Sequence, residues 1–234
     1  MRKVNILPQP TDSTCGPTSL HAVYDYFGDK VSLKTVVNEV KVLKEGGTLA
    51  VMLGCHALRR GYDTVIYTYN LRIFDPTWDL SNSKTLIQNL IKQAQVKKGK
   101  KFNKATKAYI KFLLLGGKLV SEDLTIDLLK RLFNKKLPVL TGLSATYLYN
   151  FKRETVNYKN ESIYDDIKGI PVGHFVVLNG FNRKGDIIVA DPYHGNPLFG
   201  SSYYSVKPQR LINAIMLGLI TYDANLLVIS PKKK

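Results

Sequence analysis

The spacing of apolar residues changes near residue 137, and this change limits the folds that the chain can adopt. Before that point most segments repeat their apolar residues at helical spacing, whereas the last third holds short runs rich in Val, Ile, Leu and aromatic residues. Gly, Asn and Asp-Pro turn signals separate those runs, as is typical of strands in a sheet. Helices first and antiparallel strands later favour an α+β fold.

The same patterns predict individual elements. Helical spacing predicts helices over residues 13–27, 32–42, 48–60, 84–94, 105–115, 121–133 and 207–217. Alternating or continuous apolar runs predict strands over residues 63–70, 137–150, 174–182, 186–193 and 225–231. The short turn Asn-Arg-Lys-Gly joins two of these strands, 174–182 and 186–193, so we expect them to form a hairpin.

Charge is the unusual part of the composition. The chain has 34 basic and 18 acidic residues, a net charge of +16. Residues 84–136 hold 14 Lys or Arg against 3 acids, which gives this block +11 of that total. The block forms either solvated helix faces or a docking face for an acidic partner or substrate. A nucleic-acid partner is not indicated, because the block has few interleaved aromatic residues and no named nucleic-acid motif.

The two cysteines, Cys15 and Cys55, are too few for a disulfide framework and favour a reducing compartment. The first residues are basic but lack an apolar stretch of the length that a secretory signal needs. No apolar run is long enough to span a membrane. We therefore expect a cytoplasmic location, with export by a signal-free route left open. We expect no metal site, because His and Cys residues lack ligand spacing.

Cys15 lies in the stretch QPTDSTCGPTSL, at the start of the first predicted helix. Free backbone N–H groups and the positive end of the helix dipole favour a thiolate at such a position. Pro17 suits the first turn of a helix. The side-chain amide of Gln9, six residues earlier, can join the Cys15 backbone N–H in an oxyanion hole. The alternative for Cys15 is a small buried apolar residue without a chemical role.

His174 is the best candidate for a base among the four histidines. His21 points away from Cys15 on their common helix, His56 is placed to pack or to face solvent, and His194 lies in a loop. His174 begins a predicted strand, and Asp191 ends the strand that is hairpinned to it. We therefore expect the Asp191 carboxylate to lie beside the His174 ring and orient it.

These motifs together resemble the C39-type cysteine peptidases of the papain-like clan. The resemblance covers about residues 5–80 and 137–230 and rests on QPTDSTCGPTSL, GHFVVLNGF and IVADP. It implies a papain-like α+β fold in which the N-terminal nucleophile helix packs against a C-terminal antiparallel sheet. It also implies that Gln9 is the oxyanion residue, Cys15 the nucleophile, His174 the base and Asp191 the orienting acid.

The expected activity is hydrolysis of peptide or amide bonds in a peptide or protein, through a thioester and without a cofactor. We expect one domain over residues 1–234, with the basic helical block at about 82–136 as an insertion. Other reactions of the same site remain open: deamidation, transpeptidation or another acyl transfer, and removal of a protein modifier. A non-catalytic basic binding module is the alternative from a different class.

Overall fold

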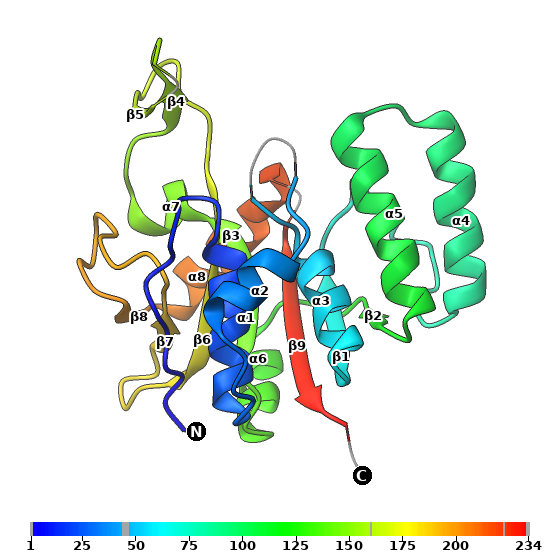
Figure 1. Cartoon of the computed structure of the whole chain (residues 1–234), viewed down its shortest axis with the longest axis horizontal. Coiled ribbons are helices and arrows are strands. Elements are labelled where there is room, and N and C mark those ends of the chain that lie inside the picture. The colour runs from blue at the N-terminus through cyan, green and yellow to red at the C-terminus, as the bar shows by residue number, and fades with distance from the viewer. Residues whose placement is uncertain (1, 44–46, 160, 222, 233–234) are drawn as a thin grey trace.

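A seven-stranded sheet runs through the centre of the protein (Figure 1). The structure is a computed structural model that describes residues 2–43, 47–159, 161–221 and 223–232. In order across the sheet, the strands are β2 (Lys118–Val120), β1 (Tyr62–Thr68), β9 (Asn225–Pro231), β3 (Val139–Ser144), β6 (Gly173–Phe181), β7 (Ile187–Ala190) and β8 (Tyr203–Val206). Neighbouring strands are antiparallel except β1 and β2, which are parallel.

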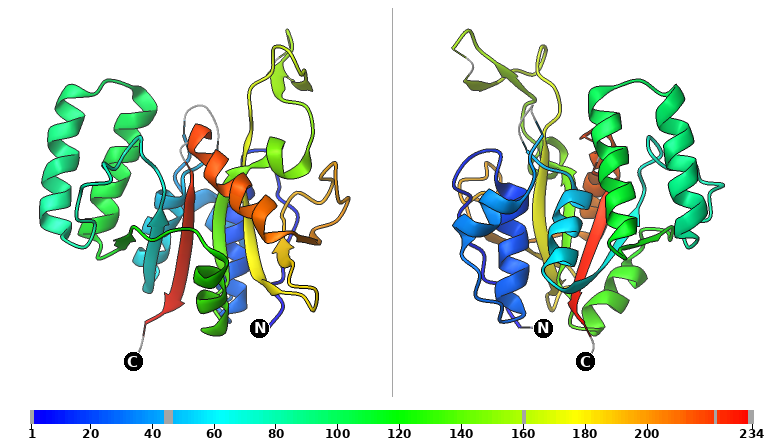
Figure 2. Two further views of the ribbon diagram at one scale, coloured as in Figure 1. Left: turned by 180° about the vertical axis from the view of Figure 1, so that it is seen from behind. Right: turned by 45° about the vertical axis from the view of Figure 1, so that its right-hand side comes forward.

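Helices cover both faces of this sheet, as the two views of Figure 2 show. On one face lie α1 (Cys15–Tyr26) and α3 (Ala50–Arg59), and on the other lie α6 (Ile126–Asn134), α7 (Ala145–Tyr149) and α8 (Pro208–Leu217). Side chains alternate between two cores, so Leu227 and Ile229 of β9 join the first while Leu226 and Val228 join the second. Burial on both faces explains why the central strands read as continuous apolar runs.

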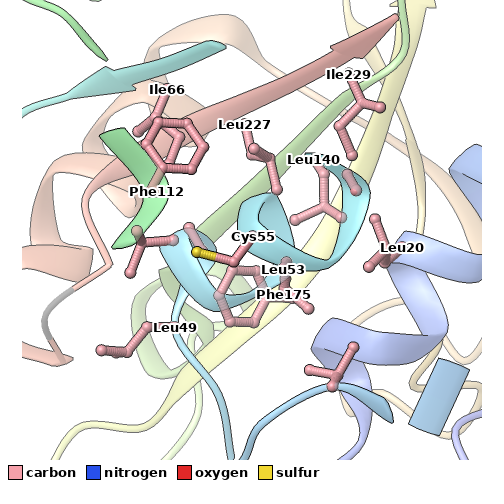
Figure 3. Close-up of a cluster of buried hydrophobic side chains, with 14 of the residues drawn as sticks. Leu20, Leu49, Leu53, Cys55, Ile66, Phe112, Leu140, Phe175, Leu227 and Ile229 are labelled. Carbon is pink, nitrogen blue, oxygen red and sulfur yellow. The ribbon is translucent and has the colours of Figure 1, made fainter. Parts of the chain in front are cut away.

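The first core holds α1 and α3 against the sheet, and Figure 3 shows part of it. Leu20 of α1 and Leu53 of α3 are fully buried there, and Leu53 lies beside Phe175 of β6. The expected arrangement, with an N-terminal helix packed on a C-terminal, mostly antiparallel sheet, is confirmed. Helix α2 (Leu33–Glu39) is also close to its prediction, and its cap Ser32 accepts a hydrogen bond from Thr35 N.

The prediction of one strand over residues 137–150 is wrong in its second half. The strand β3 ends at Ser144, whose hydroxyl accepts a hydrogen bond from Tyr147 N and caps α7. Asn150 then ends that helix in the left-handed conformation, with φ of 54°. The apolar run in the sequence thus continues across a change from strand to helix.

Other boundaries also differ from the predictions. The helix expected from residue 121 begins at Ile126, because the Thr125 hydroxyl caps it by accepting from Leu128 N. Four short strands were not predicted: β2, β8 and the two strands of a separate small sheet, β4 (Glu154–Val156) and β5 (Ser162–Tyr164). They have three or four residues each, too few for a clear alternation of apolar and polar positions.

The basic block is distributed over several parts of the fold. Helices α4 (Ser83–Val96) and α5 (Lys100–Leu114) form an antiparallel pair at one end of the molecule (Figure 1). Helix α5 packs on α3 so closely that a Cβ on Gly54 would lie 2.8 Å from Cε2 of Phe112. Strand β2 joins the edge of the sheet, and α6 packs against its second face.

Candidate active site

Cys15 is the first residue of α1, and the structure places its side chain at the face of the sheet. Helix α1 approaches the sheet closely at this end: a Cβ on Gly16 would lie 2.5 Å from Cγ2 of Thr48 and 3.2 Å from Cδ2 of Phe175. Phe175 follows His174 on β6, so the tight contact between α1 and β6 brings Cys15 toward the histidine. The thiol is 8% exposed.

His174 and Asp191 form the contact that the hairpin predicts. Strands β6 and β7 pair with Val177 opposite Ala190, which brings the start of β6 beside the end of β7. The His174 ring nitrogen Nε2 then lies 2.8 Å from Oδ1 of Asp191. Cys15 is the other neighbour of the ring: it lines the same cavity as His174, and its charge raises the pKa of the histidine.

Two tyrosines that the sequence analysis did not identify complete the surroundings of Asp191. The hydroxyls of Tyr149 on α7 and Tyr204 on β8 each donate a hydrogen bond of 2.6 Å to Oδ2. The backbone N–H of Tyr193 donates to Oδ1 at 2.8 Å. Asp191 is fully buried, and these donors supply the hydrogen bonds that a buried carboxylate needs in place of water.

The electrostatics of the pair favour a charged imidazolium beside a charged carboxylate. Burial lowers the pKa of His174, but the charges of Asp191 and Cys15 outweigh it and raise the pKa to about 10. Burial alone would raise the pKa of Asp191, yet the His174 charge and the two tyrosine hydroxyls hold that pKa below its usual value. Burial raises the pKa of Tyr149 and of Tyr204, so both stay protonated donors.

A cavity of about 600 Å³ opens beside Cys15 and His174. Its walls come from the segment before α1, from the chain leading into α3, from α5 and from the β4–β5 arm, which projects from the body in Figure 1. Asp12, Glu154 and Lys101 are among the lining residues. A volume of about 600 Å³ lies within the range of ligand-binding clefts in proteins.

Gln9 lies on the other side of the histidine. It lines a second cavity of about 260 Å³ together with Gly173, His174 and Tyr149. Its backbone N–H donates to the Pro192 carbonyl oxygen at 2.9 Å, which ties the N-terminal segment to the residue after Asp191. Its side-chain Nε2 donates to the carbonyl oxygen of Thr11 at 3.0 Å, and its Oε1 is buried without a hydrogen-bond partner.

Asp223 is a buried carboxyl group that also lines the large cavity. It accepts a hydrogen bond of 2.8 Å from the Ala50 N–H, at the first turn of α3. Burial raises the pKa of Asp223 to about 7, against the opposing effects of the Ala50 N–H and the Lys101 charge. Nothing in the sequence around Asp223 indicated this contact, which joins residues 173 positions apart.

The other candidate histidines lie apart from this site. His56 bonds to the Tyr24 hydroxyl and to Glu39, and His21 bonds to the Val31 carbonyl oxygen. In the described ranges, no group of three or more His, Cys, Asp or Glu side chains is placed to hold a metal ion. Among the described helices, none combines the length and the apolar character that a membrane span needs.

Comparisons with known proteins show a family and solved structures to which the chain is similar. A family model described as "Peptidase_C39 like family" matches residues 1–209. The fold is similar to the crystal structure of a protein from Bacillus anthracis described as a C39-like peptidase, with a TM-score of 0.52 and 14% identity over 99% of this chain and 96% of that one. Xylellain, a cysteine protease from Xylella fastidiosa, matches with a TM-score of 0.42 and 13% identity over 100% of this chain and 85% of that one. No curated protein sequence matches the chain significantly.

Proposed function

Because the chain belongs to the peptidase C39-like family, we propose that it is a cysteine peptidase whose catalytic residues are Cys15, His174 and Asp191, with Gln9 in the oxyanion hole. The observation that carries the proposal is the buried chain of contacts from Cys15 through His174 to Asp191. A thiol, an imidazole and a carboxylate in this order are the groups that nucleophilic acyl transfer requires.

In the proposed reaction the Cys15 Sγ, as thiolate, attacks the carbonyl carbon of the scissile peptide bond. The His174 imidazolium then gives its Nδ1 proton to the leaving amine as the carbon–nitrogen bond breaks, which leaves a thioester on Cys15. Neutral His174 next takes a proton from water, whose oxygen attacks the thioester and releases the acid product and the thiolate. Asp191 holds the ring and stabilises its charge throughout.

Gln9 and the Cys15 backbone N–H are the proposed donors to the oxyanion. For this role the Gln9 Nε2 exchanges the Thr11 carbonyl oxygen, its acceptor in the structure, for the oxygen of the substrate. The backbone hydrogen bond from Gln9 to Pro192 supports the role, because it fixes the segment relative to Asp191 while the side chain turns. No specific observation favours deamidation, acyl transfer or modifier removal over peptide hydrolysis.

We further propose that residues 1–234 act as one peptidase domain. The support is that β9, near the end of the chain, pairs with both β1 and β3 in the single large sheet. The α4–α5 pair is the part of the basic block that fits an insertion, since it packs beside α3 rather than across the sheet.

The test compares the N-terminal peptides of a proteome treated with the wild-type protein and with the Cys15→Ala variant. New N-termini that appear with wild type alone support peptide hydrolysis and report the bonds that are cut. If the wild type and Cys15→Ala produce the same N-terminal peptides and cleave them at the same rate, the assignment of Cys15 as nucleophile is wrong.

A further inference from the structure

A groove between α3 and α5 has a basic rim, and it lies outside the proposed active site. Its volume is about 320 Å³. The cations at its rim are Lys41, Arg59, Lys104, Lys107 and Lys111. No carboxylate is among the described residues that line it, although the described chain carries acids elsewhere on its surface.

The geometry of two helices concentrates these charges. Lys104, Lys107 and Lys111 are spaced three and four residues apart and so lie along one face of α5. Arg59 ends the facing helix α3, and Lys41 follows α2. Among the described ion pairs none involves Lys107 or Lys111, so these two charges are not neutralised by a described carboxylate.

The same cations act together on a thiol at the floor of the groove. Burial raises the pKa of Cys55 to about 11, and the positive charges of Arg59, Lys111 and Lys41 oppose that rise. Three separate segments therefore direct their positive field onto one spot. Cys55 itself points from α3 into the packed layer beside α5, where its Sγ contacts the Ala108 carbonyl oxygen at 3.6 Å (Figure 3).

The floor of the groove is aliphatic rather than aromatic. Val42, Met52 and Ala108 line it with Cys55, and no aromatic ring is among the described lining residues. Val42, next to Lys41, is 57% exposed, a large apolar surface beside a charged residue. An aliphatic floor suits an aliphatic side chain, whereas sequence-tolerant binding of single-stranded nucleic acid relies on aromatic rings for base stacking.

The groove adjoins the cavity of Cys15 and His174 on two sides. Leu43 lines that cavity, and its neighbour Val42 lines the groove. On α5, Lys101 lines the cavity and Lys104, about one helical turn on, lines the groove. Neighbouring residues of these two segments thus line the two spaces.

We propose that this basic groove binds an acidic peptide segment that inserts one aliphatic side chain between its carboxylates. Charge complementarity selects the acidic segment, and the aliphatic floor selects the inserted side chain. This acidic segment belongs to the substrate and is separate from the residues that form the scissile bond. Its assignment to the substrate rests on the proposed function. The groove thus selects substrates at a distance from the reaction.

The test measures binding of a short fluorescein-labelled peptide in which Asp and Glu residues flank one Leu, by fluorescence anisotropy. The full chain is used as Cys15→Ala, so that binding is read without cleavage. Lys107→Glu with Lys111→Glu should weaken binding about tenfold or more, because two attractive charges become repulsive. The matched control, Lys84→Glu with Lys92→Glu, makes the same change of net charge on exposed positions of α4 outside the groove.

Val42→Ser, or Ser in place of the Leu of the peptide, should weaken binding about threefold or more through the lost apolar contact. Thermal midpoints confirm that each variant is folded.

The proposal is overturned if the two lysine double variants lose the same binding affinity, or if neither loses any. Tighter binding of a single-stranded oligonucleotide of equal charge, with displacement of the peptide, would overturn it in favour of nucleic acid. If binding of the peptide depends on Lys107 and Lys111 but the wild-type protein cleaves no peptide bond, the result supports the groove as a binding site and rejects the proposed function.

Discussion

The Nε2 atom of His174 lies 2.8 Å from Oδ1 of Asp191, and the residues between them form one hairpin of the central sheet. Because strands β6 and β7 are joined by a short turn, this distance is set within a small part of the chain. The Tyr149 hydroxyl that donates to Asp191, and the Asp223 carboxyl group at the start of α3, depend instead on segments that are more distant in sequence.

Thiol labelling should distinguish the two cysteines. Cys55 is buried and its pKa is raised to about 11, so at neutral pH it is almost entirely a protonated thiol. Cys15 lies at a helix start in the cavity beside an imidazolium. Iodoacetamide at neutral pH should therefore modify Cys15 first, as read by peptide mapping, and the Cys15→Ala variant should lose this fast reaction. Faster modification of Cys55 would contradict the prediction.

Replacing Asp191 by Asn should lower the pKa of His174, because it removes the negative charge that raises it. The imidazolium that the proposed reaction needs is lost as pH rises through the pKa of His174, about 10 in the native protein. The alkaline limb of the kcat/KM profile should therefore move to lower pH in Asp191→Asn, with a loss of rate of about 10²–10⁴. An unchanged alkaline limb would show that Asp191 does not set the charge of the histidine.

The tyrosines should act as positioning residues. Tyr149→Phe or Tyr204→Phe removes one hydrogen bond to a buried carboxylate, worth about 1.5–3 kcal/mol, and should lower kcat about tenfold or more with little change in KM. The acid limb of the rate profile should move to higher pH, because Asp191 loses a donor that lowers its pKa. Tyr147→Phe, on the same helix as Tyr149, is the matched control and should keep the wild-type profile.

Asp223 should make the protein less stable as pH rises from about 4 to 7. Its pKa is about 7 when folded and near 4 when unfolded, so in this window the native state holds one more proton. The contribution to the free energy of unfolding then falls by at most about 1.4 kcal/mol per pH unit. Urea unfolding of the wild type and of Asp223→Asn across this pH window measures this contribution as the difference between the two proteins. Parallel curves for the two proteins would rule the linkage out.

Gly16→Ala should destabilise the protein by about 1–3 kcal/mol, because the added Cβ would meet the Thr48 methyl group at 2.5 Å. Thr48→Ser removes that methyl but keeps the hydroxyl, which donates to the Lys41 carbonyl oxygen. The double variant should recover part of the lost free energy of unfolding in urea. Recovery should be incomplete, since Phe175 lies 3.2 Å from the same Cβ position. Additive losses would show that the contact with Thr48 is not the cause.

Local sequence patterns were sufficient for much of the fold. Helical spacing identified α1, α3 and α8, and apolar runs with turn signals identified the β6–β7 hairpin. The errors fall where one apolar run spans two elements, as at Ser144, or where a strand is very short, as for β8. In those places the cap or the pairing partner decides the structure, and a partner on another strand leaves no periodic signal in its own segment.

The sequence by itself determined that Cys15 begins a helix and that His174 and Asp191 share one hairpin, because both features depend on neighbouring residues. Only the tertiary structure decided that α1 docks on β6, that Tyr149 and Tyr204 meet Asp191, and that Asp223 meets the first turn of α3. The lysines of α5 likewise form a groove only with Arg59 of α3 and Lys41. Such contacts follow from the packing of whole helices against a sheet, where complementary surfaces select partners that no local pattern specifies.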